Sequence, residues 1–299
     1  MYAPVVLFAY NRLSHLKHTV ESLKKNHLVH DTDLIIYSDA PKSVQQENAV
    51  KLVRNYLHSI DGFKSVNIVE QDKNLGLALS VIEGVTSVVN KYGRVIVLED
   101  DLVISTNFLQ YMNDALNKYE AEVRVISIHG YSYPINGLPN IFFLRGADCW
   151  GWATWQDRWK LFEPNGSKLL QELTEKKLLN KFDFNGTYSF SGMLKSQISG
   201  INDSWAIRWH ASAFLLNKLT LYPGKSLVRN IGNDGTGTHS GNTDFYSVDL
   251  SDSPIEMQSI PLQESERAYA QFELFFRQTK GSFFRRIINK LKSIWIIFF

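Results

Sequence analysis

The stretch RVIVLEDDLVIS, residues 94–105, decides the fold of this chain. It begins with a short apolar run, Val95 to Leu98, which is typical of a strand buried on both faces of a sheet. Three acidic residues follow directly: Glu99, Asp100 and Asp101. Because two carboxylates ~4 Å apart repel each other by about 4 kcal/mol at an effective dielectric near 20, such a cluster needs protons or a cation. The stretch therefore predicts a buried strand with a cluster of acidic residues at its carboxyl end, and we expect this cluster to have a function.

Short apolar runs alternate with helix-like stretches in the first half of the chain. We expect strands over 4–9, 33–38, 66–70, 94–98 and 124–128. Between them, apolar residues recur at helical spacing from Leu13 to Leu23 and from Val81 to Val89. This alternation predicts an α/β fold with a mostly parallel sheet covered by helices on both faces. In such sheets, ligands bind at the carboxyl ends of the strands.

Polar residues follow the first four expected strands and predict a nucleotide site. They are Asn11 and Arg12 after the first strand, Asp39 after the second, and Asn74 and Gly76 after the third. The acids after the fourth strand offer hard oxygen ligands, which suit Mg²⁺ or Mn²⁺. Because side chains alternate along an extended chain, we expect Glu99 and Asp101 to point to one side and Asp100 to the other. The alternatives are a solvated acidic turn, or an N-cap of the helix that begins near Asn107.

The second half of the chain differs from the alternating first half. It carries two tryptophan-rich motifs, DCWGWATWQDRW (148–159) and INDSWAIRWHASAFLL (201–216). Sugars stack their C–H faces on indole rings, so Trp150 or Trp152 is a candidate sugar contact. Packing in the core is the alternative for both. Cys149 lies directly before Trp150, and we expect it to pack beside these tryptophans rather than to react.

A glycine-rich stretch, NIGNDGTGTHSGN (230–242), follows these motifs. Glycine permits the turns that let backbone N–H groups converge on a phosphate. His239 is therefore a candidate metal or diphosphate ligand, with Asp234 as a weaker one and a plain surface-loop histidine as the alternative.

Composition narrows the class of protein. The chain has 299 residues, 44% of them hydrophobic, with a formal net charge of +2, so nucleic acid is not an expected partner. Cys149 is the single cysteine, which excludes a disulfide framework and favours a reducing compartment. The start of the chain lacks the features of a signal peptide, and no apolar run reaches the ~18 residues that a membrane span needs. These features predict a cytoplasmic protein.

The C-terminal segment 283–299 is basic and amphipathic on a helical projection. Its apolar residues gather in one arc and its lysines and arginines on the other face, which is typical of a helix lying on an anionic membrane surface. A helix docked on the protein's own core is the alternative.

Several of these motifs are similar to those of a known enzyme family. VVLFAYNR resembles the opening strand of the large family-2 glycosyltransferases, and VIVLEDDLVISTNFLQY resembles the Golgi N-acetylglucosaminyltransferases that start complex N-glycans, in which EDD replaces the usual DxD. WGWATWQDRW and NDSWAIRW continue the likeness more weakly, over roughly residues 3 to 245. The resemblance implies a GT-A (Rossmann-like) fold and an inverting, metal-dependent glycosyltransferase.

The resemblance also implies roles for individual residues. Asp101 becomes the direct ligand of Mn²⁺ or Mg²⁺, Asp100 sits beside the ribose or sugar, and Glu99 lies near the base and sugar. Asp39 accepts from the nucleobase, and Arg12 lies against the nucleotide. Inverting transfer needs one general base, and the resemblance implies Asp203 for that role; the alternative for Asp203 is an N-cap.

Together these expectations describe one enzyme. Residues 1–130 form the nucleotide-sugar-binding half of a GT-A domain, 131–262 the acceptor-binding half, and 263–299 the C-terminal helices with a membrane-surface tail. The enzyme moves a hexose or N-acetylhexosamine, carried on UDP, to a saccharide or lipid-linked acceptor in surface polysaccharide synthesis at the inner face of the plasma membrane. The rivals are a non-catalytic nucleotide-sugar or glycan-binding protein, a sugar nucleotidyltransferase, and a glycosidase, which would need two carboxylates flanking a cleft.

Overall fold

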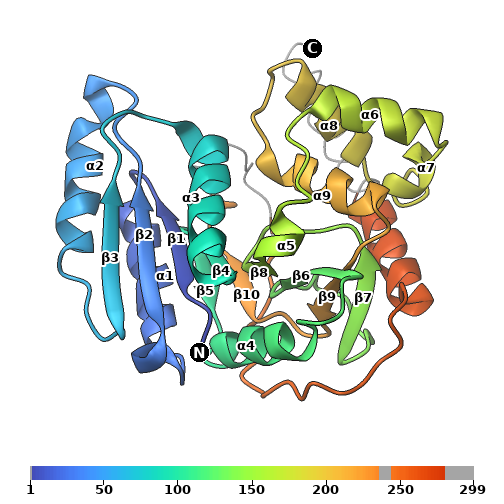
Figure 1. Cartoon of the computed structure of the whole chain (residues 1–299), viewed down its shortest axis with the longest axis horizontal. Helices are drawn as coiled ribbons and strands as arrows, with labels where there is room; N and C mark the ends of the chain where they lie inside the picture. The colour runs from blue at the N-terminus through green and yellow to red at the C-terminus, as the bar shows by residue number, and fades with distance from the viewer. Residues whose placement is uncertain (1, 236–243, 280–299) are drawn as a thin grey trace, which may run out of the picture.

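The computed structural model describes residues 2–235 and 244–279 (Figure 1). Its central feature is an eight-stranded sheet in the order β3-β2-β1-β4-β8-β6-β9-β7. The strands are β1 (Val5–Ala9), β2 (Asp33–Ser38), β3 (Ser65–Glu70), β4 (Arg94–Glu99), β6 (Val125–His129), β7 (Ile141–Arg145), β8 (Trp152–Trp155) and β9 (Leu219–Pro223). The five strands expected from apolar runs are confirmed to within one residue at each end.

Helices occupy the connections between these strands. They are α1 (Leu13–Lys24), α2 (Val44–Leu57), α3 (Gly76–Tyr92), α4 (Phe108–Lys118), α5 (Gln156–Trp159), α6 (Gly166–Glu175), α7 (Leu179–Phe182), α8 (Phe190–Ile198) and α9 (Trp205–Leu215), with a short 3₁₀ helix, η1 (Val29–Asp31). A separate two-stranded ribbon pairs β5 (Leu102–Ile104) with β10 (Val228–Asn230). A further helix spans 266–279.

The sheet is mostly parallel, as predicted. β1 pairs in parallel with both β2 and β4, β2 pairs in parallel with β3, and β6 pairs in parallel with β9. Two strands run the other way: β8, which lies between β4 and β6, and the edge strand β7. A strand entering antiparallel beside β4 starts where β4 ends, so the loop before β8 lies at the carboxyl end of β4.

Helices cover both faces of the sheet, and the alternation of side chains along β1 shows how. Val5 and Leu7 belong to the core that includes apolar residues of α1, α2 and α4. Val6 and Phe8 belong to the core on the opposite face, which includes residues of α3 and α9. Because strands buried on both faces must be apolar at every position, VVLFA in β1 and VIVL in β4 carry no polar residue.

The two predicted halves share this one sheet. Residues after 131 supply β7, β8 and β9, and Figure 1 shows α6 to α9 grouped on the side away from α2 and β3. The helix over 266–279 packs Ala268, Phe272 and Phe276 against Phe142 of β7 and Tyr222 of β9.

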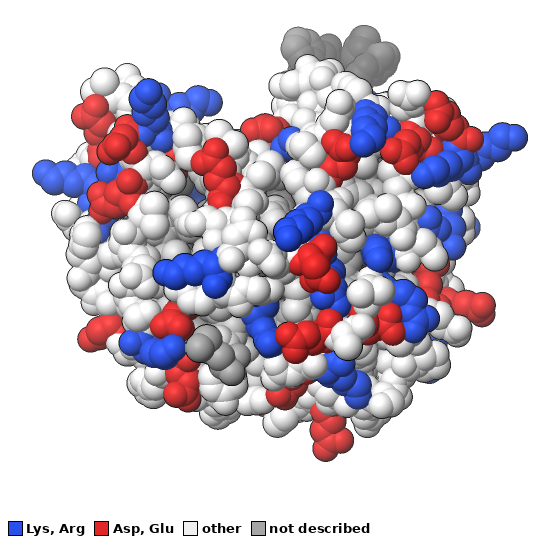
Figure 2. Space-filling view, viewed as in Figure 1, with Lys and Arg blue, Asp and Glu red and all other residues white. Residues whose placement is uncertain are grey.

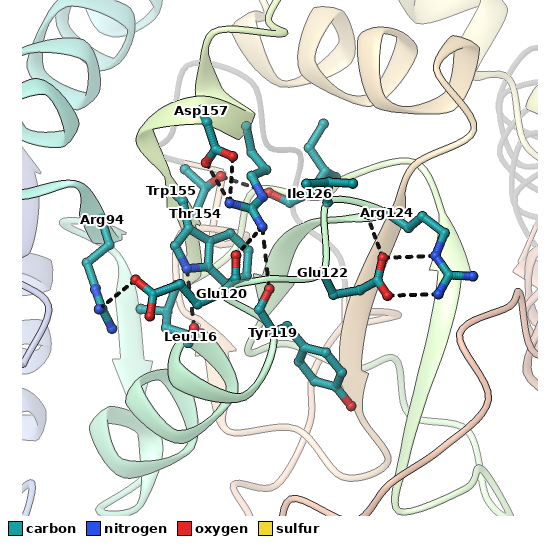
Figure 3. A network of polar contacts seen from close by, with 12 residues as sticks. Arg94, Leu116, Tyr119, Glu120, Glu122, Arg124, Ile126, Thr154, Trp155 and Asp157 are labelled. Carbon is teal, nitrogen blue, oxygen red and sulfur yellow. Dashed lines mark hydrogen bonds and ion pairs between the residues drawn. The ribbon is translucent and has the colours of Figure 1, made fainter.

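A buried arginine joins α5 to the chain that follows α4. Arg158 in α5 pairs with Asp157 and donates to the carbonyl oxygens of Tyr119 and Glu120, the latter at 2.5 Å. Figure 3 shows this network, with Arg94 at the start of β4 close to Glu120. Because the partners of Arg158 are its neighbour Asp157 and two backbone carbonyls just after α4, we assign this network to stability.

Acidic and basic side chains are interspersed on the face of the molecule shown in Figure 2. That face carries no broad basic area. Among the described residues, no helix has the length and apolar character to cross a membrane.

Candidate functional site

The strand order makes a topological switch point of the neighbouring strands β1 and β4. β2, which follows β1 in the chain, lies on one side of this pair, whereas β6, the next strand of the same sheet after β4, lies on the other side. The chain thus leaves the neighbouring strands β1 and β4 in opposite directions, and ligands of α/β sheets bind at such switch points. Arg12 follows β1 and the acidic triplet ends β4, so the topology places both at this switch point.

Arg12 holds two members of the triplet with one nitrogen. Its Nη2 donates to Asp100 Oδ1 at 2.5 Å and to Asp101 Oδ2 at 2.8 Å. The Tyr10 backbone N–H donates to Asp100 Oδ2 at 3.4 Å. The prediction that Asp100 points away from Asp101 is wrong, because β4 ends at Glu99 and the chain turns at Asp100. The two aspartates therefore meet on the same guanidinium.

Burial and mutual repulsion shape the charge of the triplet. Burial, together with the negative charges of Asp101 and Asp100, raises the pKa of Glu99 to about 8. Burial raises the pKa of Asp100 to about 6, against the opposing effect of Arg12. For Arg12, burial disfavours the charged form, but the two aspartates outweigh burial and raise the guanidinium pKa. At neutral pH the triplet therefore carries a protonated Glu99 beside an arginine-paired aspartate couple.

The Glu99 shift predicts a pH dependence of stability. Glu99 binds its proton more tightly when folded than when unfolded, where its pKa is near 4.5. The stability from this proton is complete below about pH 4.5 and is lost as the pH rises through about 8, at roughly 1.4 kcal/mol per pKa unit. We expect Glu99→Gln, which stays neutral, to gain in melting temperature relative to the parent between about pH 5 and about pH 9 in EDTA.

Glu122 provides the matched control for this measurement. Hydrogen bonds from Arg124 lower the pKa of Glu122 to about 2, so its titration lies below the tested range. The melting temperature of Glu122→Gln should follow the parent with a constant offset. A constant offset for Glu99→Gln as well would show that Glu99 is ionised throughout.

The segment that follows β10 packs against Asp101 of the triplet. The ribbon pairs Asn230 with Leu102, and the Ile231 N–H donates to the Asp101 carbonyl at 2.9 Å. Gly232 then packs so closely that a Cβ at this position would lie 2.0 Å from Asp101 Oδ2. Asp234, the weaker candidate of the glycine-rich stretch, pairs with His15 of α1 at 3.1 Å. This segment thus encloses Asp101 between Arg12 and the Gly232 backbone.

The triplet has the right atoms for a divalent cation, but Arg12 stands in the cation's place. Carboxylate oxygens are the ligands that Mg²⁺ and Mn²⁺ prefer. Within 2–235 and 244–279, no three histidine, cysteine or acidic side chains form a group able to hold a metal ion. The two aspartates instead converge on the Arg12 guanidinium. The donor set therefore fits a cation once Arg12 has released it.

The predicted residues Asp39, Asn74 and Gly76 come together at the ends of β2 and β3. Asp39 Oδ1 accepts from the backbone N–H groups of Ala40 and Leu75, each at 2.9 Å. Its Oδ2 accepts from Gly76 N at 2.9 Å and from Asn74 Nδ2 at 3.1 Å. A carboxylate has about four acceptor sites, so Asp39 is fully engaged in holding the start of α3. Its nucleobase contact stays a prediction that requires one of these bonds to open.

Asp148 is a candidate site residue that the sequence reasoning missed. It lies in the loop before β8, at the carboxyl end of β4, and its Oδ1 accepts from Cys149 N at 2.8 Å. Asp148 Oδ2 lies 3.6 Å from Nε2 of His129, which is fully buried at the end of β6. Burial lowers the pKa of His129, although Asp148 opposes this. The signal was the antiparallel entry of β8, which local patterns do not reveal.

The two candidate tryptophans occupy different environments. Trp150 is half-buried and packs edge-on against Tyr131 and Tyr246. Trp152 is fully buried and packs against Trp159, Trp205 and Trp209. A completely buried indole has no face for a sugar, so Trp152 belongs to the core and Trp150 keeps the proposed contact. Cys149 packs here as expected, and burial raises the pKa of its thiol.

Asp203 lies just before α9 with its side chain 70% exposed. Its carboxylate is 3.5 Å from Arg208 Nη2. The N-cap alternative for Asp203 is wrong, because Ser204 caps α9 by accepting from Ile207 N at 3.2 Å. An exposed carboxylate free of capping duty remains available for proton transfer. The candidate metal or diphosphate ligand His239 lies outside the described residues, as does the tail 283–299.

Comparison with protein families gives a match in the first half of the chain. The model of "Glycosyl transferase family 2" matches residues 5–148, which run from β1 through the triplet to Asp148. A search of curated proteins found no match.

Several solved structures are similar to part of this chain and are themselves only partly covered by it. The chain is similar to Staphylococcus aureus TarS 1–349 in complex with UDP-GlcNAc, with 12% identity, a TM-score of 0.34 and coverage of 46% of this chain and 36% of TarS. For TarS 1–349 alone the identity is 10%, the TM-score 0.43, and the coverage 78% and 61%. The mannosyltransferase PcManGT from Pyrobaculum calidifontis, in complex with GDP-Man and Mn²⁺, shares 16% identity with a TM-score of 0.33, over 45% of this chain and 37% of that one.

Proposed function

The family model of "Glycosyl transferase family 2" matches residues 5–148, and from that match we propose that the chain is such an enzyme and transfers a sugar from a nucleotide-diphosphate donor with inversion of configuration. The observation that carries the proposal is the convergence of Arg12, Asp100 and Asp101 at the switch point between β1 and β4. A cationic side chain and paired carboxylates at this position suit a charged diphosphate and its counterion. The family favours transfer over the rival binding and nucleotidyltransferase functions.

Residues at the carboxyl ends of the strands would bind the donor. The groups held by Asp39 at the start of α3 would face the nucleoside, and Arg12 would bind the diphosphate through its N–H donors. Asp101 would hold Mn²⁺ or Mg²⁺, with Asp100 and Glu99 toward the ribose and sugar. Such an ion, when bound, offsets the charge that grows on the leaving diphosphate.

Asp203 would act as the general base. The acceptor hydroxyl oxygen attacks the anomeric carbon while its proton passes to Asp203, and the bond from that carbon to the diphosphate oxygen breaks. The packing of α9 supports this role, because Trp205 stacks on Trp152 at 5.4 Å and Trp152 pairs with Val97, two residues before Glu99. The start of α9 thus belongs to the same end of the sheet as the triplet.

A donor screen tests this function. We expect one or more UDP-sugars to release UDP with Mn²⁺ or Mg²⁺, less in EDTA, and to give a product of inverted anomeric configuration. Release of pyrophosphate would identify a nucleotidyltransferase instead. Retention of configuration would reject the role of Asp203, and unchanged turnover in EDTA would reject the role of the cation.

The acceptor is the second part of the proposal: a saccharide or lipid-linked acceptor at the inner membrane surface in surface polysaccharide synthesis. Support comes from the basic amphipathic sequence of 283–299. Removing residues 281–299 should abolish co-sedimentation with liposomes containing anionic lipid and leave UDP release in solution intact. Equal sedimentation of the full and shortened chains would reject the membrane part alone.

A further inference from the structure

We infer that Arg12 and a divalent cation compete for the same two carboxylates, so that the cation binds tightly only when a diphosphate is present to receive Arg12. The second clause rests on the proposed function, because it takes the donor to be a nucleoside diphosphate sugar. The competition itself needs no donor. Arg12 would thus act as a built-in counterion that makes metal binding depend on donor binding.

The guanidinium and a divalent cation would draw on the same two oxygens. One nitrogen, Nη2, lies 2.5 Å from Asp100 Oδ1 and 2.8 Å from Asp101 Oδ2. Oxygen ligands bind Mg²⁺ at about 2.0–2.1 Å and larger divalent cations slightly farther out. An ion at that distance from both oxygens would stand beside the positively charged guanidinium, and the two cations would repel each other. The guanidinium and the ion therefore compete for the two aspartates.

The carboxylates are less free to move than the arginine. Asp101 is held through its carbonyl by Ile231 N at 2.9 Å, and its Oδ2 faces the backbone of Gly232, where no side chain would fit. The carbonyl of Asp100 accepts from Thr19 Oγ1 at 2.8 Å. The guanidinium of Arg12 is the end of a long flexible side chain that is 21% exposed. We therefore assign the movement to Arg12.

A diphosphate is the acceptor that Arg12 lacks. Its second terminal nitrogen, Nη1, is buried without a hydrogen-bond partner among the described residues. A guanidinium has five N–H donors in a planar fork that matches phosphate oxygens. Arg12 also stands at the N-cap of α1, and helix starts favour anions. Phosphate oxygens arriving here would satisfy Nη1 and compensate Nη2 for the loss of the aspartates.

Electron paramagnetic resonance of free Mn²⁺ tests the competition with the full chain and no nucleotide. We expect Arg12→Gln to bind Mn²⁺ at least about tenfold more tightly than the parent, and Arg12→Lys to stay close to the parent. Arg124→Gln removes an exposed arginine that also pairs with an acid, Glu122, and should leave the affinity unchanged. Adding Asp101→Asn to Arg12→Gln should remove the gain, which places the ion on the triplet.

The second part of the experiment measures Mn²⁺ binding in the presence of UDP. In the parent, UDP should tighten Mn²⁺ binding at least about tenfold, whereas in Arg12→Gln it should tighten it by less than about threefold. Equal or weaker Mn²⁺ binding by a folded Arg12→Gln, judged by its melting temperature, would overturn the inference. So would equal cooperativity with UDP in both proteins. If no sugar nucleotide were turned over, the proposed function would fail, while the nucleotide-free competition would still be decided by its own measurement.

Discussion

Asp101→Asn should lower donor turnover about 100- to 1,000-fold, because a neutral amide at this position attracts a divalent cation far less than a carboxylate does. The amide oxygen can still accept from Arg12 Nη2, which lies 2.8 Å from Asp101 Oδ2, so the fold should persist. Nucleoside diphosphate release under saturating donor measures the effect, with Mn²⁺ titrated to high concentration.

Asp61→Asn is the matched control for this variant. Asp61 also pairs with a basic residue of the α1 region, Lys24 at 2.8 Å, but it is 84% exposed and distant in sequence from the triplet. Its turnover should stay within about twofold of the parent, as expected for an exposed ion pair. Near-parental turnover of Asp101→Asn would mean that the chemistry lies elsewhere.

Asp203→Asn should separate chemistry from binding. Removing a general base costs about 100- to 10,000-fold in turnover, whereas UDP affinity should stay within about twofold, because Asp203 contacts none of the residues placed at the nucleotide. Its exposed side chain and long contact with Arg208 make a large loss of stability unexpected. Product formation with the preferred donor and UDP binding by calorimetry measure the two quantities.

The control for this second variant is Asp114→Asn, which alters a half-buried aspartate of α4 whose partner is Gln110. It should change neither turnover nor affinity. If Asp203→Asn is as active as this control, Asp148 becomes the carboxylate to test next, because it lies at the carboxyl end of β4 with 29% of its side chain exposed. A joint loss of turnover and UDP affinity would point to a binding role for Asp203.

The site was only partly visible in local patterns. Asp39, Asn74 and Gly76 were predicted to share an edge because parallel strands end together, and hydrogen bonds confirm that they do. The engagement of all four Asp39 acceptor sites was not predictable, since three of the four donors come from the loop more than thirty residues later. Trp152 shows the converse case, because its burial follows from three tryptophans on other elements.

The sequence by itself determined the α/β class, the strand positions and the acidic end of β4. These features depend on patterns among neighbouring residues: continuous apolar runs for strands buried on two faces, and apolar residues at helical spacing for helices. Only the tertiary structure decided what the acids face. The turn at Asp100 brings it and Asp101 to an arginine 88 and 89 positions earlier in the chain, and the ribbon sets Gly232 against Asp101. Such contacts depend on which strands become neighbours, and strand order is a property of the whole packed sheet.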